Sequence, residues 1–594
     1  MSSYLFAILC VLNGCLCESG ILRDELSLMN EQLLKLNSIS SHLAWTEVTQ
    51  PDQGKKLRLV EVNTEWRHSW CRKLLKNYKI NVFGDDDEYR QFYLLCRGPS
   101  YGSEQARELS ETLDALRRVY RTKICRKDGS CLSGERDLEN LMERSRDPEE
   151  LLWAWIEWRN NVGEASKDVY IKLVELLNIG AKNNGYNDIG ECWKEELETN
   201  DPERLAEKLY SEVKSLYVAL HAVVRYKLNR YYGSDLVSLN EGIPSDLLGS
   251  LWGQNWGSLI DMIVDMPKSY NITASLRRRN YTVTDLVKRS EDFYVSLGFR
   301  PMTEEFWKNS KFVKDGDDDP VCHGSAVNMF RGNDFRMLLC ADVTSEDFQV
   351  INHEMGHVQY YAQYQHQPAI FQEGTNPAFQ EAIGGAVFYG IMTPNHLQRL
   401  GLIPEVDDSS GIDLRLLLEQ ALYKLPQIPF ALALEKWRWG VFRGDIAPED
   451  YNKAWWFLRE KYQGVKPPVP RSEEFFDPAA VFHVNDNVPY ISYFFSTILE
   501  VQIFESLCNG TFTGYEMNKT VPIQLHRCDI YGSKEGAKKL RSMMSLGRRI
   551  HWTEALKMVT GETDYSTRPL LNYYRPLYKW LIREIVKYRI PVGW

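Results

Sequence analysis

Apolar residues recur three and four positions apart over long stretches of this chain, with charged residues between them. This spacing is that of one buried face of an α-helix, and it is clearest at residues 105–120, 149–180, 202–232 and 413–440. Alternating patterns typical of strands are few. The sequence therefore predicts a mainly α fold with few short strands.

Loop-sized breaks interrupt the helical pattern without dividing the chain. They fall at the acidic run Asp315–Asp319, which Pro320 follows, at Thr393–Pro394 and at the proline-rich segment Lys466–Arg471. No repeat of about 20 to 50 residues and no low-complexity linker is visible. We therefore expect a single catalytic domain over residues 18–594.

The first residues have the pattern of a secretory signal peptide. The apolar run Tyr4–Leu12 is too short to cross a bilayer, and small residues that follow it offer a cleavage site. We expect residues 1–17 to be removed and the protein to be secreted into the extracellular space. No later stretch approaches the roughly 20 apolar residues of a membrane helix, so we expect no membrane anchor.

The cysteines agree with an oxidising compartment. Removing Cys10, Cys15 and Cys17 with the signal peptide leaves nine of 12, an odd number, so one thiol is unpaired. Short separations favour local bridges, while other pairings stay open: the favoured pairs are Cys125–Cys131, Cys322–Cys340 and Cys508–Cys528, and the open residues are Cys71, Cys96 and Cys192. Four glycosylation sequons also fit secretion: Asn271, Asn280, Asn509 and Asn518.

Composition and charge narrow the function. Hydrophobic residues make up 44% of the 594 residues, enough for a large core. Lys and Arg total 71 against 81 Asp and Glu, and the formal net charge of -10 provides no overall positive field to hold a polyanion. We therefore expect no nucleic-acid partner.

The motif HEMGH at residues 353–357 is the strongest chemical signal. His353 and His357 are four residues apart and lie on one face of a helix, where two imidazoles can bind one zinc ion. Glu354 then lies beside the metal. Apolar and aromatic residues surround the motif, and a buried pair of histidines without a partner would be costly.

A catalytic zinc needs a third protein ligand and one open position for water. The three-histidine pattern fails because residues 360 and 363 are tyrosine and glutamine, and His366 is out of register. Glu381 is a better candidate, since Asn376 can cap and Pro377 can open a second helix that crosses the first. By itself, a glutamate 24 residues after the motif is more often a surface carboxylate, so the pattern leaves the third ligand open.

Several blocks together resemble the angiotensin-converting enzyme family, the zinc peptidyl-dipeptidases that remove dipeptides from the carboxyl ends of peptides. They occur in the family's order: LLWAWIEWRNNVG at 151–163, LWGQNW at 251–256, VCHGSA at 321–326, HEMGHVQYY at 353–361, EGTNPAFQEAIG at 373–384, WWFLREKYQG at 455–464 and VPYISYF at 488–494. The resemblance covers about residues 105–594, while residues 18–104 match poorly. It implies a large two-lobed helical ellipsoid with a deep central cleft that admits peptides and excludes folded proteins.

By position, the resemblance implies that His353, His357 and Glu381 bind one zinc ion and that Glu354 is the general base. It also implies donors that face the tetrahedral oxyanion, which can stabilise it by several kcal/mol: these are His483 and Tyr493. Groups implied to bind the substrate main chain are His323 with the backbone of Gly324 and Ala326, and groups implied to bind its terminal carboxylate are Gln254 and Tyr490.

Four departures from the family pattern change these expectations. Gly385 replaces a carboxylate that would accept the free N–H of a zinc-binding histidine, and losing such a group typically costs about 10- to 100-fold in affinity or activity. Val481 replaces a lysine that pairs with the terminal carboxylate of the substrate, so only neutral donors remain there. Gln427 and Thr497 replace aromatic side chains, which should make the prime-side pocket more polar.

The remaining departure concerns chloride. Trp455 and Arg459 fit one anion site of the family, with Lys194 in place of an arginine. Ser492 replaces the arginine of the other site, beside Tyr232. We therefore expect chloride activation to be weak or missing.

Three functions compete on this sequence. A secreted zinc metallopeptidase acting on short peptides follows from HEMGH and Glu381, although Val481 leaves the release of dipeptides open. A catalytically impaired protein that binds peptides, or acts as a decoy, follows from Gly385 and Val481. A purely structural or receptor-type protein has the least support, because it has to treat the zinc residues as a relic.

Overall fold

Helices dominate the computed structural model, which describes residues 2–49, 59–78, 86–264, 271–313, 324–404, 410–512 and 524–594. Helices α1–α8 are α1 (Ser2–Thr49), α2 (Leu59–Asn77), α3 (Asp86–Cys96), α4 (Ser103–Val119), α5 (Gly134–Arg144), α6 (Pro148–Asn183), α7 (Ile189–Glu196) and α8 (Pro202–Tyr232). Helices α9–α16 are α9 (Ile260–Ile263), α10 (Ile272–Arg278), α11 (Val283–Ser296), α12 (Glu304–Asn309), α13 (Ser345–Tyr364), α14 (Pro377–Ile391), α15 (Pro394–Arg399) and α16 (Ser410–Lys424). Helices α17–α24 are α17 (Gln427–Arg443), α18 (Tyr451–Leu458), α19 (Phe482–Asn485), α20 (Ile491–Phe512), α21 (Lys538–Met544), α22 (Trp552–Thr560), α23 (Arg568–Tyr573) and α24 (Arg575–Tyr588).

The strands of the described residues are short and form three two-stranded sheets. Two sheets are antiparallel, β1 (Lys123–Cys125) with β2 (Cys131–Ser133) and β4 (Ser325–Asn328) with β5 (Phe335–Leu338). The third pairs β3 (Ile243–Pro244) in parallel with β6 (Val465–Lys466). The predicted mainly α fold with few short strands is confirmed.

The helical periodicity located α4, α6 and α8 correctly, but the stretch 413–440 contains two helices. It divides between α16 and α17 at Leu425–Pro426, because proline cannot donate a backbone hydrogen bond and disfavours helical geometry in the residue before it. The predicted break at Thr393 is confirmed, since its side chain accepts a hydrogen bond from His396 N and caps α15. The predicted break at 315–320 lies outside the described residues.

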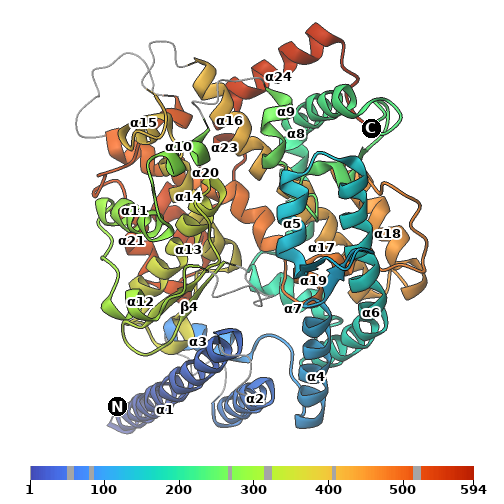
Figure 1. The fold of residues 1–594 in the computed structure, drawn as a ribbon. Coiled ribbons are helices and arrows are strands. Elements are labelled where there is room, and N and C mark those ends of the chain that lie inside the picture. Colours follow the sequence, from blue (N-terminus) through green and yellow to red (C-terminus); the bar gives the residue numbers. More distant parts are fainter. Residues whose placement is uncertain are drawn as a thin grey trace.

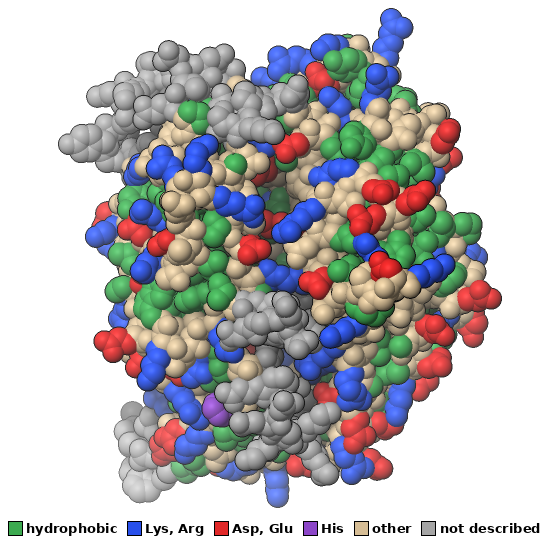
Figure 2. Space-filling view, in the orientation of Figure 1, with side chains coloured by type: hydrophobic (Ala, Val, Ile, Leu, Met, Phe, Trp, Pro, Cys, Tyr) green, Lys and Arg blue, Asp and Glu red, His purple; other side chains and the backbone are tan. Residues whose placement is uncertain are grey.

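Two groups of helices lie side by side in Figure 1, with α10–α15, α20 and α21 in one and α4–α8 with α17–α19 in the other. Helix α20 packs against both α14 and α17 and so joins the two groups. Figure 2 shows the described surface hollowed between them. The deep cleft implied by the family resemblance stays a prediction.

One large apolar core extends from Tyr101 to Ile590. The N-terminal helices have a smaller core of their own, in which Leu22 and Leu26 of α1 meet Trp70 of α2 and Phe92 of α3. Helix α1 begins at Ser2 and so includes residues 2–17 of the predicted signal peptide, whose removal stays a prediction. Within the described ranges, none of the helices combines the length and apolarity that a membrane span requires.

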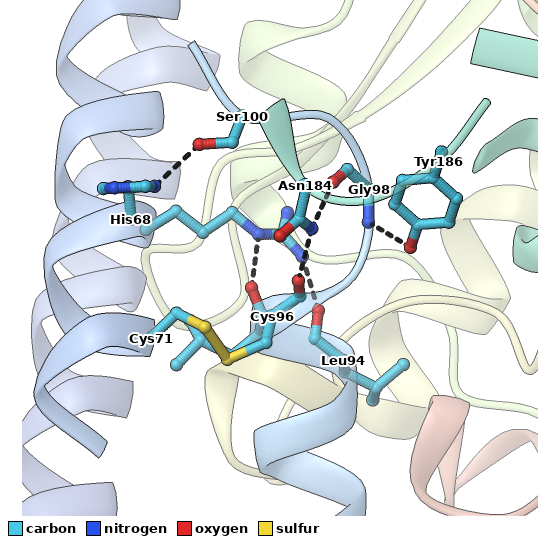
Figure 3. The surroundings of a disulfide bond; sticks show 10 residues. His68, Cys71, Leu94, Cys96, Gly98, Ser100, Asn184 and Tyr186 are labelled. Carbon is cyan, nitrogen blue, oxygen red and sulfur yellow. Dashed lines mark hydrogen bonds between the residues drawn. A yellow bond between two sulfur atoms is a disulfide. The ribbon is translucent and has the colours of Figure 1, made fainter. Parts of the chain in front are cut away.

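The disulfide Cys71–Cys96 links α2 to the end of α3, and polar contacts attach this corner to the main body (Figure 3). Asn184, which follows α6, donates through Nδ2 to the carbonyl oxygens of Cys96 at 2.9 Å and Gly98 at 2.7 Å. The Gly98 backbone N–H donates to Tyr186 Oη at 3.1 Å. The disulfide therefore holds α2 and α3 together, and hydrogen bonds anchor them to the segment that follows α6.

The other cysteines follow the sequence interpretation where they are described. The predicted bridges Cys125–Cys131 and Cys508–Cys528 are confirmed, and Cys192 is a free, buried thiol. Cys322 lies outside the described residues. Of the sequons, Asn280 and Asn509 are exposed, Asn271 is partly exposed and caps α10, and Asn518 lies outside the described residues.

Candidate active site

The HEMGH motif lies on α13. The Thr344 side chain caps this helix, accepting a hydrogen bond at 2.9 Å from the backbone N–H of Asp347. Ile351, Met355 and Val358 are fully buried and hold one face of α13 in the core. A second side of the helix, which carries both histidines, is then left to face α14.

Two glycines let α13 and α14 approach closely. A Cβ built on Gly356 would lie 2.5 Å from the Cα of Gly384, and a Cβ on Gly384 would lie 2.5 Å from the carbonyl oxygen of His353. Only residues without a side chain fit this crossing. As predicted, Asn376 caps α14 by accepting a hydrogen bond from Phe379 N at 3.0 Å, and Pro377 opens the helix. The crossing carries Glu381 to the histidines.

The separations of the three predicted ligands fit one zinc ion. His353 Nε2 lies 3.2 Å from both His357 Nε2 and Glu381 Oε2, and His357 Nε2 lies 3.8 Å from Glu381 Oε2. Ligands about 2.0–2.2 Å from a tetrahedral zinc ion lie roughly 3.3–3.5 Å from one another, and zinc accepts imidazole and carboxylate donors. Glu354 belongs to the same cluster, with a ligand atom within 4.8 Å of both imidazoles.

Burial and mutual charge set the protonation of this cluster. Burial, with the nearby Glu381 carboxylate, raises the pKa of Glu354 to about 7, which is suited to taking up and returning a proton near neutral pH. Burial lowers the pKa of His357 to about 4, so its imidazole is neutral, as metal binding requires. Burial opposes ionisation of Glu381, but the hydrogen bond with His353 and the electrostatic interaction with the two imidazoles hold the pKa of Glu381 below its usual value.

Three predicted substrate-facing side chains lie together beside this cluster. His483 Nε2 is 3.4 Å from Tyr493 Oη. The Tyr490 ring lies 4.7 Å from the His483 ring and 4.6 Å from the Tyr493 ring, between centroids. The Glu381 carboxylate interacts electrostatically with His483 and both tyrosines. The structure therefore brings α19 and the start of α20 to the candidate zinc site.

The remaining predicted substrate-binding residues lie on β4 and on the loop after β3. The Ala326 backbone forms a hydrogen bond with Glu354, and its carbonyl oxygen accepts one from Tyr361 Oη at 3.2 Å. Gln254 Oε1 accepts a hydrogen bond from Ser250 Oγ at 2.9 Å. His323 lies outside the described residues.

A carboxylate from α20 fills the volume beside Gly385. A Cβ built on Gly385 would lie 2.0 Å from Glu500 Cδ and 2.2 Å from Glu500 Oε1, so no side chain at residue 385 can coexist with that carboxylate. Glu500 is 2% exposed, and its Oε2 lies 2.8 Å from Lys424 Nζ. Neither Glu500 nor Lys424 was predicted from the sequence, although a lone glutamate within the apolar run of α20 was an available signal.

One of the two predicted anion sites has suitable donors. Arg459 and Trp455 are buried, with 5.1 Å between the guanidinium carbon and the ring centroid, and neither Arg459 Nη1 nor Trp455 Nε1 has a hydrogen-bond partner within the described parts of the chain. Both N–H groups can donate to an anion such as chloride. Lys194 instead pairs with Glu203 at 3.3 Å.

Tyr232 and Ser492 of the second predicted anion site are on different helices. Tyr232 closes α8 with its ring beside Tyr231, and Ser492 is buried at the start of α20. Across the described ranges, neither a hydrogen bond nor a ring contact joins them.

The two predicted pocket substitutions differ in effect. Gln427 opens α17 and is partly exposed, so its amide remains polar surface. Thr497 is 1% exposed, and its hydroxyl donates to the Tyr493 carbonyl of its own helix at 2.7 Å. Thr497 therefore contributes less polarity to a pocket than its residue type suggests.

A partly buried group of carboxylates near Gln254 was not predicted from the sequence. Glu139 Oε2 accepts a hydrogen bond from Leu251 N at 2.5 Å, and Glu346 Oε1 accepts one from Asn255 Nδ2 at 3.0 Å. Burial raises the pKa of Glu139 to about 8, and burial with the Glu346 carboxylate raises the pKa of Glu143 to about 10. The spacing of four residues between acids on α5 was the available signal.

Comparisons with known proteins agree with this geometry. A family model described as angiotensin-converting enzyme matches residues 23–594, which extends the resemblance to the N-terminal helices. The chain is 41% identical over 495 residues to angiotensin-converting enzyme of Mesocricetus auratus, covering 83% of this chain and 37% of that protein. It is 40% identical over 496 residues to the angiotensin-converting enzyme-like protein Ace3 of Mus musculus, covering 83% and 66% respectively.

A relative of similar length comes from Haematobia irritans exigua. Its angiotensin-converting enzyme is 33% identical over 589 residues, which are 97% of this chain and 96% of that protein. The chain thus spans little more than a third of the first mammalian relative but nearly the whole of this one. On this coverage, and with the zinc-binding pattern folded as that pattern requires, the chain belongs to the angiotensin-converting enzyme family of metallopeptidases.

Proposed function

We propose that this chain is a secreted zinc metallopeptidase that hydrolyses short peptides and releases dipeptides from their carboxyl ends. The observation that carries the proposal is the convergence of His353, His357 and Glu381 from two helices, at separations that suit one zinc ion. The disulfides and the predicted signal peptide 1–17 support secretion, and residues 18–594 would form a single catalytic domain.

His353, His357 and Glu381 would hold the zinc ion. When bound, zinc polarises a carbonyl oxygen and lowers the pKa of water. Glu354 accepts the proton of the attacking water and returns it to the leaving amine, for which its raised pKa of about 7 is suited.

The neighbouring donors position the peptide. His483 and Tyr493 face the developing oxyanion, and preorganised donors in a water-poor site stabilise such a charge. His323 and the Ala326 backbone hold the substrate main chain, while Gln254 and Tyr490 hold the terminal carboxylate. Trp455 Nε1 and Arg459 Nη1 would be the donors to a chloride ion, if this chain binds one.

The test is peptide digestion by purified protein with one equivalent of zinc, with products identified by mass spectrometry. We expect losses of two residues from peptide carboxyl ends, abolished by a chelator and restored by zinc. Absence of cleavage across a broad peptide library contradicts the proposal. Tight peptide binding without cleavage would instead support the peptide-binding alternative.

A further inference from the structure

We propose that Glu500 is the positioning residue for the zinc-binding imidazole of His353. Its carboxylate comes from α20 and occupies the space that glycine at residue 385 leaves open, one helical turn after Glu381. The inference rests on the proposed zinc site and adds a residue to it from a third helix.

The location of the carboxylate follows from the packing of α14. Gly385 lies one helical turn after Glu381, on the same side of the helix. The preceding residue, Gly384, packs directly against the backbone of His353, because a Cβ there would lie 2.7 Å from the His353 Cα. The Glu500 carboxylate occupies the side-chain volume of residue 385, so it lies beside the junction of His353 and Glu381.

The chemistry of a zinc-binding histidine calls for such a group. His353 Nε2 faces the other two ligands at 3.2 Å, which leaves Nδ1 as the nitrogen directed away from the metal position. A metal-bound imidazole generally donates that second N–H to a carboxylate or carbonyl, which orients the ring and increases its basicity. Glu500 and His353 already interact electrostatically.

Lys424 explains how a second carboxylate is tolerated so near Glu381. Its Nζ lies 2.8 Å from Glu500 Oε2, and the two side chains are 10% and 3% exposed. The ion pair offsets the repulsion between the two carboxylates and holds one oxygen of Glu500. The other oxygen, Oε1, is the one that lies in the space beside Gly385.

Zinc affinity measured by competition with a chromophoric chelator tests this role without depending on activity. We expect the isosteric variant Glu500→Gln to weaken zinc binding about 10- to 100-fold. Wild-type protein that binds no zinc would overturn the proposed function itself. Wild-type binding with an unchanged dissociation constant in Glu500→Gln would overturn only the role of Glu500.

Moving the carboxylate back to α14 provides a matched control. Gly385→Asp alone should lower the melting temperature of the zinc-free protein, because the new side chain collides with Glu500. Glu500→Ala combined with Gly385→Asp should recover zinc affinity relative to Glu500→Ala alone. Glu500→Ala combined with Gly385→Asn should not, since it restores volume without charge. Equal recovery by Asn and Asp would overturn the inference, and Glu500→Gln decides it if the double variants fail to fold.

Discussion

Gly385 and Val481 both stand where the family pattern has a charged residue, but their surroundings differ. Beside Gly385, the Glu500 carboxylate occupies the open volume and Lys424 pairs with it. Val481 is 1% exposed, and the preceding carbonyl of Ala480 accepts a hydrogen bond from Tyr120 Oη at 3.0 Å. Burial, with the carboxylates of Glu135 and Glu139, raises the pKa of Tyr120 well above its usual value, so two acidic side chains act on this corner.

This difference separates catalysis from recognition. Every turnover by a zinc peptidase needs the metal held in one geometry. A carboxylate from another helix can therefore take over the role of one that is missing. The partner of a substrate's terminal carboxylate affects only which peptides bind well. A zinc peptidase that keeps the carboxylate beside its metal but loses the partner of the substrate's terminal carboxylate is expected to retain hydrolysis and to change its substrates.

The largest expected effect is at the metal centre. Glu354→Gln removes the proton acceptor while keeping its volume, so we expect kcat to fall about 10²- to 10⁴-fold. Zinc content, measured by elemental analysis, should stay at one ion per chain. Full activity in this variant would exclude Glu354 as the general base.

The next effect concerns the stability of the Gly385 region. Lys424→Met leaves the buried Glu500 carboxylate without its cation, so we expect a loss of about 3–5 kcal/mol in the free energy of unfolding by urea. Arg568→Met is the matched control, because Arg568 pairs with Glu505 but is 54% exposed, and such pairs contribute about 0–1 kcal/mol. Equal losses in the two variants would contradict a special role for the buried pair.

A smaller effect is expected at Val481. Val481→Lys should lower KM about 10- to 100-fold for a peptide with a free carboxylate, since a hydrogen bond to a charged group is worth about 1.5–3 kcal/mol. The same peptide with a carboxyl-terminal amide should gain little, and Val481→Met controls for size. If both peptides improve equally, Val481 does not face the terminal carboxylate.

The smallest expected effect is on the pH dependence of kcat/KM, which should be the same in wild-type protein and in Val481→Lys. Because Glu354 acts as a base, kcat/KM should fall about tenfold per pH unit once the pH drops below its pKa. Burial raises that pKa to about 7, and the zinc cation moves it lower. Wild-type protein and Val481→Lys should show the same acid limb, with its midpoint at or below pH 7. A shifted limb in the variant would couple the two regions.

The sequence by itself determined the helices and helix ends that depend on residues close together in the chain. Periodic apolar positions located α4, α6 and α8, and Asn376 with Pro377 marked the start of α14. A spacing of four residues placed both histidines on one helix face, because helical geometry depends only on neighbours along the chain. The family resemblance, more than any local pattern, singled out Glu381 as the third ligand.

Only the tertiary structure decided which distant groups meet. Gly356 and Gly384 set the close crossing that brings Glu381 to the imidazoles, and this depends on two helices packing, not on either sequence alone. Glu500 is 115 residues from Gly385 in the chain, yet it fills the space beside that glycine. A missing side chain is visible in a sequence, but its replacement by volume and charge from another helix exists only after the chain has folded.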